Sequence, residues 1–413
     1  MFFARFVCLA LMITETLFSI YHTSFLTMPL HNQTSDTENF FLSTETSAAT
    51  TTDSIGLTCE SALLMEASTG TTIYEKNADK QFRPASITKI MTLILIFDAL
   101  AENHISLTDT VTVSEYASSM GGSQVYLEPG ETQTVDTMIK CITVASANDA
   151  CVAMAEHIWG SESEFVNKMN ERAKGLSMNQ TTFINCCGLD VDGHVTTAKD
   201  IALMSRELIT KYPDIFNYTN IWMENITHTT RRGTSEFGLT NTNKLIRQYS
   251  YATGLKTGFT SLAGFCISAT AKKDNVELIA VIMKASSSKV RNAEAISLLN
   301  YGFRVCQTYT DINDTSLEAL PVKKGIVNSV PLYYSGPFNY VSVDGSDISA
   351  IEKRLDLPVE VTAPVIKGDI AGRAVYTLNG KEIGFVNILY AETVELATFG
   401  DYFMDILKAY FIA

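Results

Sequence analysis

The sequence predicts an α+β fold in which a larger domain of strands and helices is followed by a small all-β domain. Within residues 59–307, strand-like segments occur near the beginning and again after residue 264, and long apolar helical segments lie between them. Beyond residue 308 apolar and polar residues alternate, and Asn379-Gly380 is a strong signal for a two-residue hairpin. A chain of 413 residues is long enough for about two domains.

Each element of the larger domain has its own signal. Two strand-like runs between Ser61 and Lys80 flank a turn at Ser68–Gly70. Pro84 then starts a helix whose apolar residues cover more than one face, which predicts a buried helix. The remaining predicted elements are helices at Met138–Trp159 and Ala198–Thr210, strands at Gly264–Ala271 and Val276–Met283, and a helix at Lys289–Cys306.

Composition and charge exclude several kinds of protein. A chain with 46% hydrophobic and 18% charged residues folds rather than staying disordered. The net charge is −14 and no cluster of Lys and Arg occurs, so a nucleic-acid partner is not expected. None of the eight cysteines lies in a C-x-x-C pair, and the six histidines show no H-x-x-x-H or H-E-x-x-H spacing. We therefore expect neither a metal nor another cofactor.

The N-terminal segment indicates export. Arg5 precedes an apolar run from Phe6 to Ile13, which is too short to span a bilayer and is typical of a signal peptide. We expect a signal peptide at residues 1–26 and a flexible Ser/Thr-rich linker at residues 27–58. A misassigned start or a disordered tail is the alternative that the sequence leaves open.

Three short motifs carry the candidate chemistry: Ser86–Lys89 (S-I-T-K), Ser146–Asn148 (S-A-N) and Lys256–Gly258 (K-T-G). The first two patterns recur at Ser286–Lys289 and Ser177–Asn179, so a single match carries little weight. Taken alone, each motif has a structural explanation that needs no catalysis. The first would be a helix cap, the second a polar cluster at a helix end, and the third a turn into a strand. However, only the first begins a buried helix, on which residues three apart share a face. Together and in this order, the three favour one catalytic site.

These residue types suit acyl transfer by an activated serine. A serine hydroxyl is a poor nucleophile until a base takes its proton. No motif places a histidine, so Lys89 is the candidate base, and burial together with a nearby cation such as Lys256 would lower its pKa. Ser86 at a helix N-terminus would also place its own backbone N–H where a developing oxyanion needs a donor.

The ordered motifs resemble those of class A β-lactamases and penicillin-binding proteins, above all the low-molecular-mass serine D-Ala-D-Ala carboxypeptidases of peptidase family S11. Further similar segments are GGSQVYLEPGE, SANDACVAMAE, GLDVDGHVTTAKDIALMSREL, NTNKL and LKTGFTSLAGFCISATA. The resemblance implies a β-lactamase/D,D-peptidase-like domain over residues 59–307, with an antiparallel sheet flanked by helices and a helical lobe. It also implies the family's C-terminal β domain over residues 308–396. Ala147 replaces the commoner Gly, and Phe259 stands where many relatives carry His, which leaves the substrate preference and the pH profile open.

The resemblance implies catalytic roles for three residues. Ser86 would be the nucleophile, and Lys89 would take its proton. Ser146 would relay a proton to the leaving D-alanine.

Five further residues would bind the substrate, again by resemblance. Asn148 would orient the acyl chain, and Lys256 with Thr257 would hold the terminal carboxylate. Gly258 completes the third motif, and the backbone N–H of Phe259 would be the second donor to the oxyanion.

The expected function is removal of the terminal D-alanine from peptidoglycan stem pentapeptides through an acyl-Ser86 intermediate, as part of cell-wall biogenesis. Its partners would be that D-Ala-D-Ala peptide and the β-lactam antibiotics that inhibit it. A class A-like β-lactamase is an alternative, but the E-x-x-L-N run that it predicts between the second and third motifs is missing. A transpeptidase or endopeptidase would share the site. A non-catalytic penicillin-binding sensor would be expected to have lost part of the three motifs.

The last residues, 397–413, predict an amphipathic helix. Apolar residues spaced i, i+3, i+4, i+7 form one stripe, namely Phe399, Tyr402, Phe403, Ile406, Leu407, Tyr410 and Phe411. Such a helix can lie in a membrane interface, as the family's C-terminal anchors do, or pack on its own β domain. We expect the protein at the extracytoplasmic face of the cell membrane.

Overall fold

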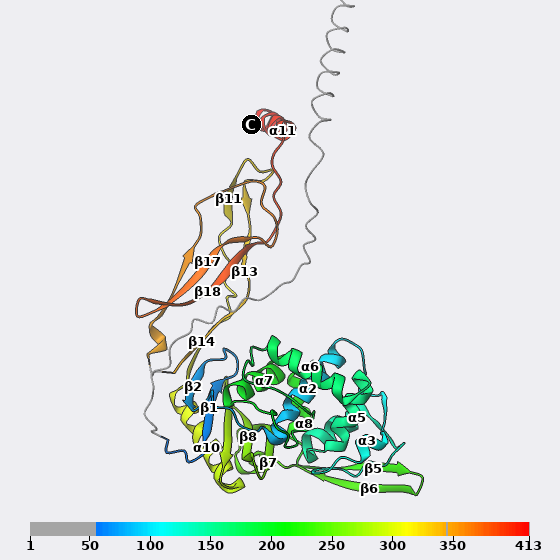
Figure 1. The fold of residues 1–413 in the computed structure, drawn as a ribbon. Helices are drawn as coiled ribbons and strands as arrows, with labels where there is room; N and C mark the ends of the chain where they lie inside the picture. The colour runs from blue at the N-terminus through cyan, green and yellow to red at the C-terminus, as the bar shows by residue number, and fades with distance from the viewer. Residues whose placement is uncertain (1–54, 344–345, 413) are drawn as a thin grey trace, which may run out of the picture. The chain divides into compact units, whose positions relative to one another are not determined.

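The computed structural model describes residues 55–343 and 346–412 (Figure 1). The predicted signal peptide at 1–26 and almost all of the predicted linker at 27–58 lie outside these residues. Within the described chain, the elements up to residue 305 form one layered part, and the strands from residue 307 onward form a second.

A five-stranded antiparallel sheet is the centre of the first part (Figure 1). Its strands in spatial order are β2 (Thr72–Lys76), β1 (Ser61–Glu66), β9 (Val276–Ala285), β8 (Gly264–Lys273) and β7 (Ala252–Thr260). The hairpin of β1 and β2 therefore pairs with β9, which is far away in the sequence and is followed in the sheet by β8 and β7. Strand β7 forms one edge of the sheet, and it carries the K-T-G motif.

Both faces of the sheet are buried, which explains the almost continuous apolar sequence of its central strands. Along β9, Ile279 and Val281 belong to the core on one face and Ala280 to the core on the other, as the two-residue period of a strand requires. Helix α7 (Ala198–Lys211) packs in the first core and α10 (Ser288–Val305) in the second. The predicted antiparallel sheet flanked by helices is confirmed.

A helical lobe lies beside the sheet and is built from the chain between β2 and β7 (Figure 1). Its elements are η1 (Ala85–Thr88), α2 (Lys89–Ala101), β3 (Thr110–Thr112), α3 (Glu115–Ser118), β4 (Thr132–Thr134), α4 (Val135–Lys140), α5 (Asn148–Trp159), α6 (Glu162–Gly175), η3 (Pro213–Ile215), α8 (Phe216–Thr219), β5 (Met223–Thr230), β6 (Gly233–Thr240) and α9 (Leu245–Gln248). Ten of the thirteen residues of α2 are buried, so the helix predicted to be apolar on several faces is indeed a core helix.

The helix predicted at Met138–Trp159 is interrupted in the structure. Helix α4 ends at Lys140, a π turn follows at Cys141–Ala145, and α5 begins at Asn148. Ser146, between them, has a φ of 61°, which is the left-handed region that a helix cannot continue through. The interruption places the second motif at a corner between two helices rather than along the side of one.

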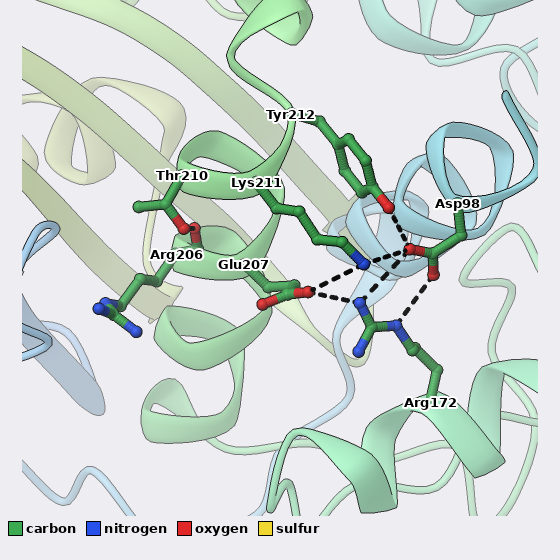
Figure 2. Close-up of polar contacts among 7 residues, drawn as sticks. All are labelled: Asp98, Arg172, Arg206, Glu207, Thr210, Lys211 and Tyr212. Atoms are coloured by element: carbon green, nitrogen blue, oxygen red, sulfur yellow. Dashed lines mark hydrogen bonds and ion pairs between the residues drawn. The ribbon is translucent and has the colours of Figure 1, made fainter. Parts of the chain in front are cut away.

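Asp98 joins α2 and α6 of the lobe to α7, which packs on the sheet, through one carboxylate (Figure 2). It lies on α2 and accepts hydrogen bonds from Arg172 of α6 (Nε to Oδ2, 2.9 Å), from Lys211 of α7 (Nζ to Oδ1, 3.0 Å) and from the Tyr212 hydroxyl. Glu207 of α7 pairs with the same guanidinium. Burial opposes the charged carboxylate, but these donors outweigh it, so the pKa of Asp98 lies below its ordinary value. The network fixes α2 against α6 and α7.

The second part is a small all-β domain, as predicted. Among the described residues its sheets are β10 (Gln307–Asp311) with β14 (Phe338–Ser342); β12 (Ser329–Val330), β11 (Leu320–Lys323) and β16 (Val361–Thr362); and β13 (Leu332–Tyr334), β18 (Lys381–Tyr390), β17 (Ile370–Leu378) and β15 (Ile351–Asp356), with a short helical turn η4 (Ile348–Ala350) before β15. Asn379 and Gly380 join β17 to β18 with φ values of 53° and 78°, so the predicted two-residue hairpin turn is confirmed.

Helix α11 (Phe399–Ile412) occupies most of the segment predicted to be an amphipathic helix. Several of its apolar side chains are exposed, including Phe399, Phe403 and Ile406. Among the residues that the structure describes, no helix has the length and apolar character needed to cross a membrane.

Candidate active site

The candidate nucleophile lies on a short turn that leads into the buried helix. Ser86 belongs to the 3-10 turn η1, and α2 begins three residues later at Lys89. The preceding residue, Ala85, has a φ of 48° in the left-handed region. This turn leaves Ser86 half-buried, and its Oγ is 3.2 Å from the Nζ atom of Lys89.

Lys89 has no exposed surface, and its Nζ atom faces three oxygen atoms. It donates to Asn148 Oδ1 at 2.6 Å and to the Cys187 carbonyl at 2.8 Å, and Ser86 Oγ is its third neighbour. Asn148 Nδ2 donates to the Gly121 carbonyl at 2.7 Å, which fixes the amide so that its oxygen faces Lys89. Amide and carbonyl oxygens only accept hydrogen bonds, so they take two of the lysine N–H groups. The remaining direction on Nζ points to the serine hydroxyl.

Ser146 and Lys256 form a second hydrogen-bonded pair in the site. Lys256 Nζ donates to Ser146 Oγ at 2.9 Å and to the Thr257 carbonyl at 3.2 Å. Lys256 is 1% exposed, and burial together with the positive charge of Lys89 holds its pKa well below the ordinary value for lysine. Ser146 reaches this amine because of the left-handed backbone at the break between α4 and α5.

Strand β7 passes close to the nucleophile, and this requires a glycine. A Cβ atom on Gly258 would lie 3.1 Å from the backbone nitrogen of Ser86 and 3.0 Å from the Pro84 carbonyl. Phe259, the next residue, is 56% exposed and stacks on Phe265 of β8, with ring centroids 4.3 Å apart. Phe259 and Phe265 thus form an apolar surface directly after the third motif.

A cleft of about 650 Å³ opens over these residues. Its lining includes Ser86, Ser146, Thr257, Gly258 and Phe259. The amines of Lys89 and Lys256 contact the hydroxyl groups of the two lining serines. The structure therefore brings together the seven residues singled out in the three motifs and Phe259, which follows the third motif. Of the second S-x-x-K match, the lysine lines the cleft and the serine does not.

Sequence reasoning missed the loop that supports Lys89 from below. Asn185 Oδ1 accepts hydrogen bonds from the backbone N–H groups of Cys187, Gly188 and Leu189, at 2.7 to 3.1 Å. This arrangement aims the Cys187 carbonyl at Lys89. A side-chain amide that gathers successive N–H groups in this way is typical of an Asx turn, so Asn185 was the available signal.

His194 lies beneath the nucleophile turn as a neutral, buried ring. The Ile184 N–H donates to its Nδ1 atom at 3.1 Å, so Nε2 carries the proton and donates to Thr88 Oγ1 at 2.9 Å. Burial lowers the pKa of His194 to about 4. The ring therefore holds Thr88 in place and is not a base for Ser86.

One group of metal-ligating atoms occurs in the described part of the chain: Glu162, Cys186 and Cys187, within 4.8 Å of one another. The Glu162 carboxylate already accepts from the Tyr116 hydroxyl and the Cys186 N–H. Hydrogen bonds with Cys151 and Cys186 hold the pKa of the Cys187 thiol below its ordinary value, but burial raises that of Cys186 well above it, and a protonated thiol is a poor metal ligand. These three residues are better explained as packing.

Comparison with known proteins places this site in a family. A family model described as D-alanyl-D-alanine carboxypeptidase matches residues 46–287, and one for the C-terminal domain of penicillin-binding protein 5 matches residues 312–396. The chain belongs to the D-alanyl-D-alanine carboxypeptidase family. The predicted family and fold are thereby confirmed, as is the predicted function, a serine D-Ala-D-Ala carboxypeptidase of peptidase family S11 that acts in peptidoglycan processing.

Individual relatives of this carboxypeptidase are similar over most of their length. D-alanyl-D-alanine carboxypeptidase DacF of Bacillus subtilis is 40% identical over 82% of this chain and 87% of its own. D-alanyl-D-alanine carboxypeptidase DacC of Escherichia coli is 32% identical over 86% of this chain and 89% of its own. The crystal structure of penicillin-binding protein 5 from Haemophilus influenzae has a TM-score of 0.71 at 29% identity, over 82% of this chain and 98% of that one.

Proposed function

We propose that this carboxypeptidase removes the terminal D-alanine of peptidoglycan stem pentapeptides through an acyl-Ser86 intermediate. The observation that carries this proposal is the environment of Lys89. Two obligate acceptors, Asn148 Oδ1 and the Cys187 carbonyl, take its N–H groups, so a neutral amine would turn its lone pair to Ser86 Oγ. A buried lysine in that state is a general base.

In the proposed acylation, Lys89 accepts the proton of Ser86 while Oγ attacks the carbonyl carbon of the scissile amide. The negative charge that develops on the carbonyl oxygen would be held by the backbone N–H groups of Ser86 and Phe259. Lys256 already donates to Ser146 Oγ, so the Ser146 hydroxyl can donate its own proton to the leaving amine. D-Alanine then leaves with the proton from Ser146, and the proton held by Lys89 returns to the Ser146 oxygen, so that Lys89 is again neutral and Ser146 again a hydroxyl. Asn148 orients the acyl chain that remains.

In the proposed deacylation, a water molecule takes the place of the leaving D-alanine. Lys89 accepts one of its protons while the oxygen attacks the ester, and the bond to Ser86 Oγ breaks as the serine recovers its proton. The products are a stem tetrapeptide and the free enzyme. A β-lactam would acylate Ser86 in the same way, but its leaving amine stays tethered and obstructs the water.

The proposed location is the extracytoplasmic face of the cell membrane, where these stem peptides occur. Export would depend on the predicted signal peptide at residues 1–26, and contact with the membrane on α11. The exposed aromatic side chains of α11, such as Phe399 and Phe403, support the second point.

Release of D-alanine from a D-Ala-D-Ala peptide tests the proposal directly. The wild-type protein should release one D-alanine per peptide and should be labelled covalently by a fluorescent penicillin. Ser86→Ala should lose both activities, because no other hydroxyl takes the place of the nucleophile. Ser286→Ala, in the second S-x-x-K match, is the control and should keep both. Labelling that survives in Ser86→Ala, or rapid steady turnover of penicillin by the wild type, would contradict the proposal.

A further inference from the structure

A buried carboxylate directly follows the second motif, and the proposed reaction does not use it. Asp149 is the second residue of α5 and has no exposed surface. An aspartate in the first turn of a helix interacts favourably with the helix N-terminus, but aspartates are rarely buried completely. Burying a carboxylate costs free energy unless hydrogen bonds replace the lost water. The partners of Asp149 therefore indicate what it stabilises.

Three backbone N–H groups donate to this carboxylate. The Ala150 N–H is local and lies 3.0 Å from Oδ1. The other two come from residues that precede Asp149 by 24 and 22 positions: the N–H groups of Val125 and Leu127 lie 3.2 and 3.1 Å from Oδ2. Burial raises the pKa of Asp149, and these donors offset only part of that increase. Stabilisation of α5 alone would not need the two distant donors.

The segment at residues 121–127 is shaped to present these two donors. Val125 and Leu127 are buried, whereas Tyr126 between them is 67% exposed and has a φ of 60°. A left-handed backbone is uncommon for a bulky residue and persists only where the surroundings impose it. The N–H groups on either side of Tyr126 meet the same oxygen of Asp149, so this carboxylate stabilises that backbone.

The other end of the same segment contacts Asn148. The Asn148 N–H donates to the Ser123 carbonyl at 2.7 Å, and its Nδ2 donates to the Gly121 carbonyl at 2.7 Å. A Cβ atom on Gly122 would lie 2.8 Å from Nδ2, so the amide fits closely against the segment. Because Nδ2 is held in this way, Oδ1 faces Lys89 Nζ at 2.6 Å. Displacement of the segment would free the amide to turn away from Lys89.

We infer that Asp149 is a positioning residue for the acyl transfer: its carboxylate holds residues 121–127 against α5, and that segment holds the Asn148 amide on Lys89. The inference rests on the proposed function, because the alignment of Lys89 matters only if Lys89 is the base. Asp149 does not belong to the described lining of the cleft, so it acts through Asn148. An aspartate that only stabilised its helix would change stability without changing the reaction.

Asp149→Asn is the test, because the amide keeps the size of the side chain but replaces one acceptor oxygen with a donor group. Whichever way it turns, its NH2 group faces a backbone N–H that also donates. Glu66→Gln is the matched control. Glu66 is 1% exposed and accepts from the backbone N–H groups of Ser68 and Thr69, and it does not line the cleft.

Thermal unfolding measures the loss of stability in both variants. Release of D-alanine from N,N′-diacetyl-L-Lys-D-Ala-D-Ala gives kcat and KM, with kcat expressed per site that a fluorescent penicillin labels at completion. We expect Asp149→Asn to lower this kcat by roughly thirtyfold, since small misplacements of catalytic groups have effects of this size. KM should change by less than about threefold. Glu66→Gln should lose stability and keep its kcat.

Two outcomes separate the inference from the proposed function. If the wild type releases D-alanine and Asp149→Asn loses only stability, with kcat within about threefold of the wild-type value, the positioning role is wrong and the function stands. If the wild type releases none, the function itself fails.

A double-mutant cycle shows whether the effect passes through Asn148. The rate of acylation by penicillin is measured for Asp149→Asn, Asn148→Ala and the double variant. Once the Asn148 amide is gone, Asp149→Asn should slow acylation by less than about threefold, because residues that act as a unit are not additive. Two effects that multiply would refute a role through Asn148.

Hydrogen exchange of the wild type covers the case in which Asp149→Asn does not fold. Mass spectrometry of short peptides follows the backbone N–H groups of Val125 and Leu127, which should exchange at least about 100-fold more slowly than those of the exposed turn at Arg231 and Arg232. Exchange as fast as in that turn would show that the carboxylate does not hold the segment, and would overturn the inference.

Discussion

At the scale of single residues, the site depends on which atoms surround two buried amines. Lys89 faces two oxygens that can only accept and one hydroxyl that can also donate. Lys256 faces the Ser146 hydroxyl and has its pKa held low by burial and by Lys89. The Lys256 amine therefore gives up its proton more readily than a solvated lysine does.

Lys89→Arg tests whether this amine must lose its proton. Arginine keeps the positive charge but does not deprotonate at working pH, so it cannot accept the proton of Ser86. We expect the rate of acylation by penicillin to fall by roughly a thousandfold, within the usual range for loss of a general base. The rate is measured by time-resolved fluorescent labelling, and thermal unfolding checks that the larger side chain is accommodated. Near-normal acylation in a folded variant would mean that Lys89 is only a structural cation.

At the scale of elements, two loops bring the motifs together. The break at Ser146 directs the second motif toward β7, and the loop after Asn185 directs a carbonyl toward Lys89. Gly188 makes the second arrangement possible. It has a φ of +90°, and a Cβ atom there would lie 1.8 Å from the Ala85 carbonyl oxygen.

Gly188→Ala should therefore damage both stability and catalysis. The added methyl group must displace either its own loop or the turn that carries Ser86. We expect a loss of roughly 3–5 kcal/mol in the free energy of unfolding, which is at the severe end for single substitutions, and a greatly reduced rate of acylation. Gly193→Ala is the matched control, because Gly193 has a similar φ of +83° and open space around it. It should cost only about 1–2 kcal/mol of backbone strain. Urea unfolding of both variants gives the comparison, and equal losses would contradict it.

The carboxylate that joins α2, α6 and α7 gives a second prediction at this scale. Asp98→Asn should lower the free energy of unfolding by about 2 kcal/mol at pH 7, because Arg172 and Lys211 lose their common acceptor charge. The folded-state pKa of Asp98 lies below its unfolded value, so its contribution is present above that value and is lost as the pH falls through the folded pKa. The deficit of the variant should therefore shrink below about pH 4. A deficit that is constant down to pH 2 would point to a packing effect.

The sequence predicts the elements whose signals are local, and it misses those that depend on tertiary contacts. The buried helix α2, the strands β8 and β9 and the Asn379-Gly380 turn follow from apolar pattern and turn chemistry, and the structure has them. Helix α6 was missed although Ser161 caps it by accepting from the Glu164 N–H, a recognisable capping signal. The hairpin of β5 and β6 is mostly exposed and polar, so its alternation carries little apolar signal.

The residues of the site were predictable from the three motifs, but their supporting atoms were not. A backbone carbonyl such as that of Cys187 has no signature in the sequence, because every residue has one. The left-handed backbone at Ser146 was equally unpredictable, because a serine in a sequence does not indicate a positive φ as a glycine does. The basic side chains that line the cleft, Lys244, Lys289 and Arg291, lie outside the three motifs, and only folding brings them together.

At the scale of the whole molecule, α11 stands apart because none of its residues belongs to either hydrophobic core of the larger domain. Its exposed apolar side chains make contact with a membrane surface the natural prediction. Phe399→Ser combined with Phe403→Ser should reduce binding to phospholipid vesicles by at least about tenfold, because each buried phenylalanine contributes roughly 2 kcal/mol. Val359→Ser, which removes an apolar side chain that is 89% exposed on the β domain, is the control. Sedimentation with vesicles measures both, and unchanged binding of the double variant would refute a role for α11.

The absence of carboxylates from the described lining of the cleft also bears on how a substrate arrives. A molecule of net charge −14 repels a distant anion. The cleft lining, with Lys244, Lys289 and Arg291 and no carboxylate, attracts an anion instead, so the field sorts collisions by orientation before any contact is made. Productive encounters should thus become rarer as ions screen that field. The peptide substrate is attached to an insoluble polymer and cannot rotate freely, so the enzyme itself must turn. The field would then turn the enzyme so that its cleft faces the polymer.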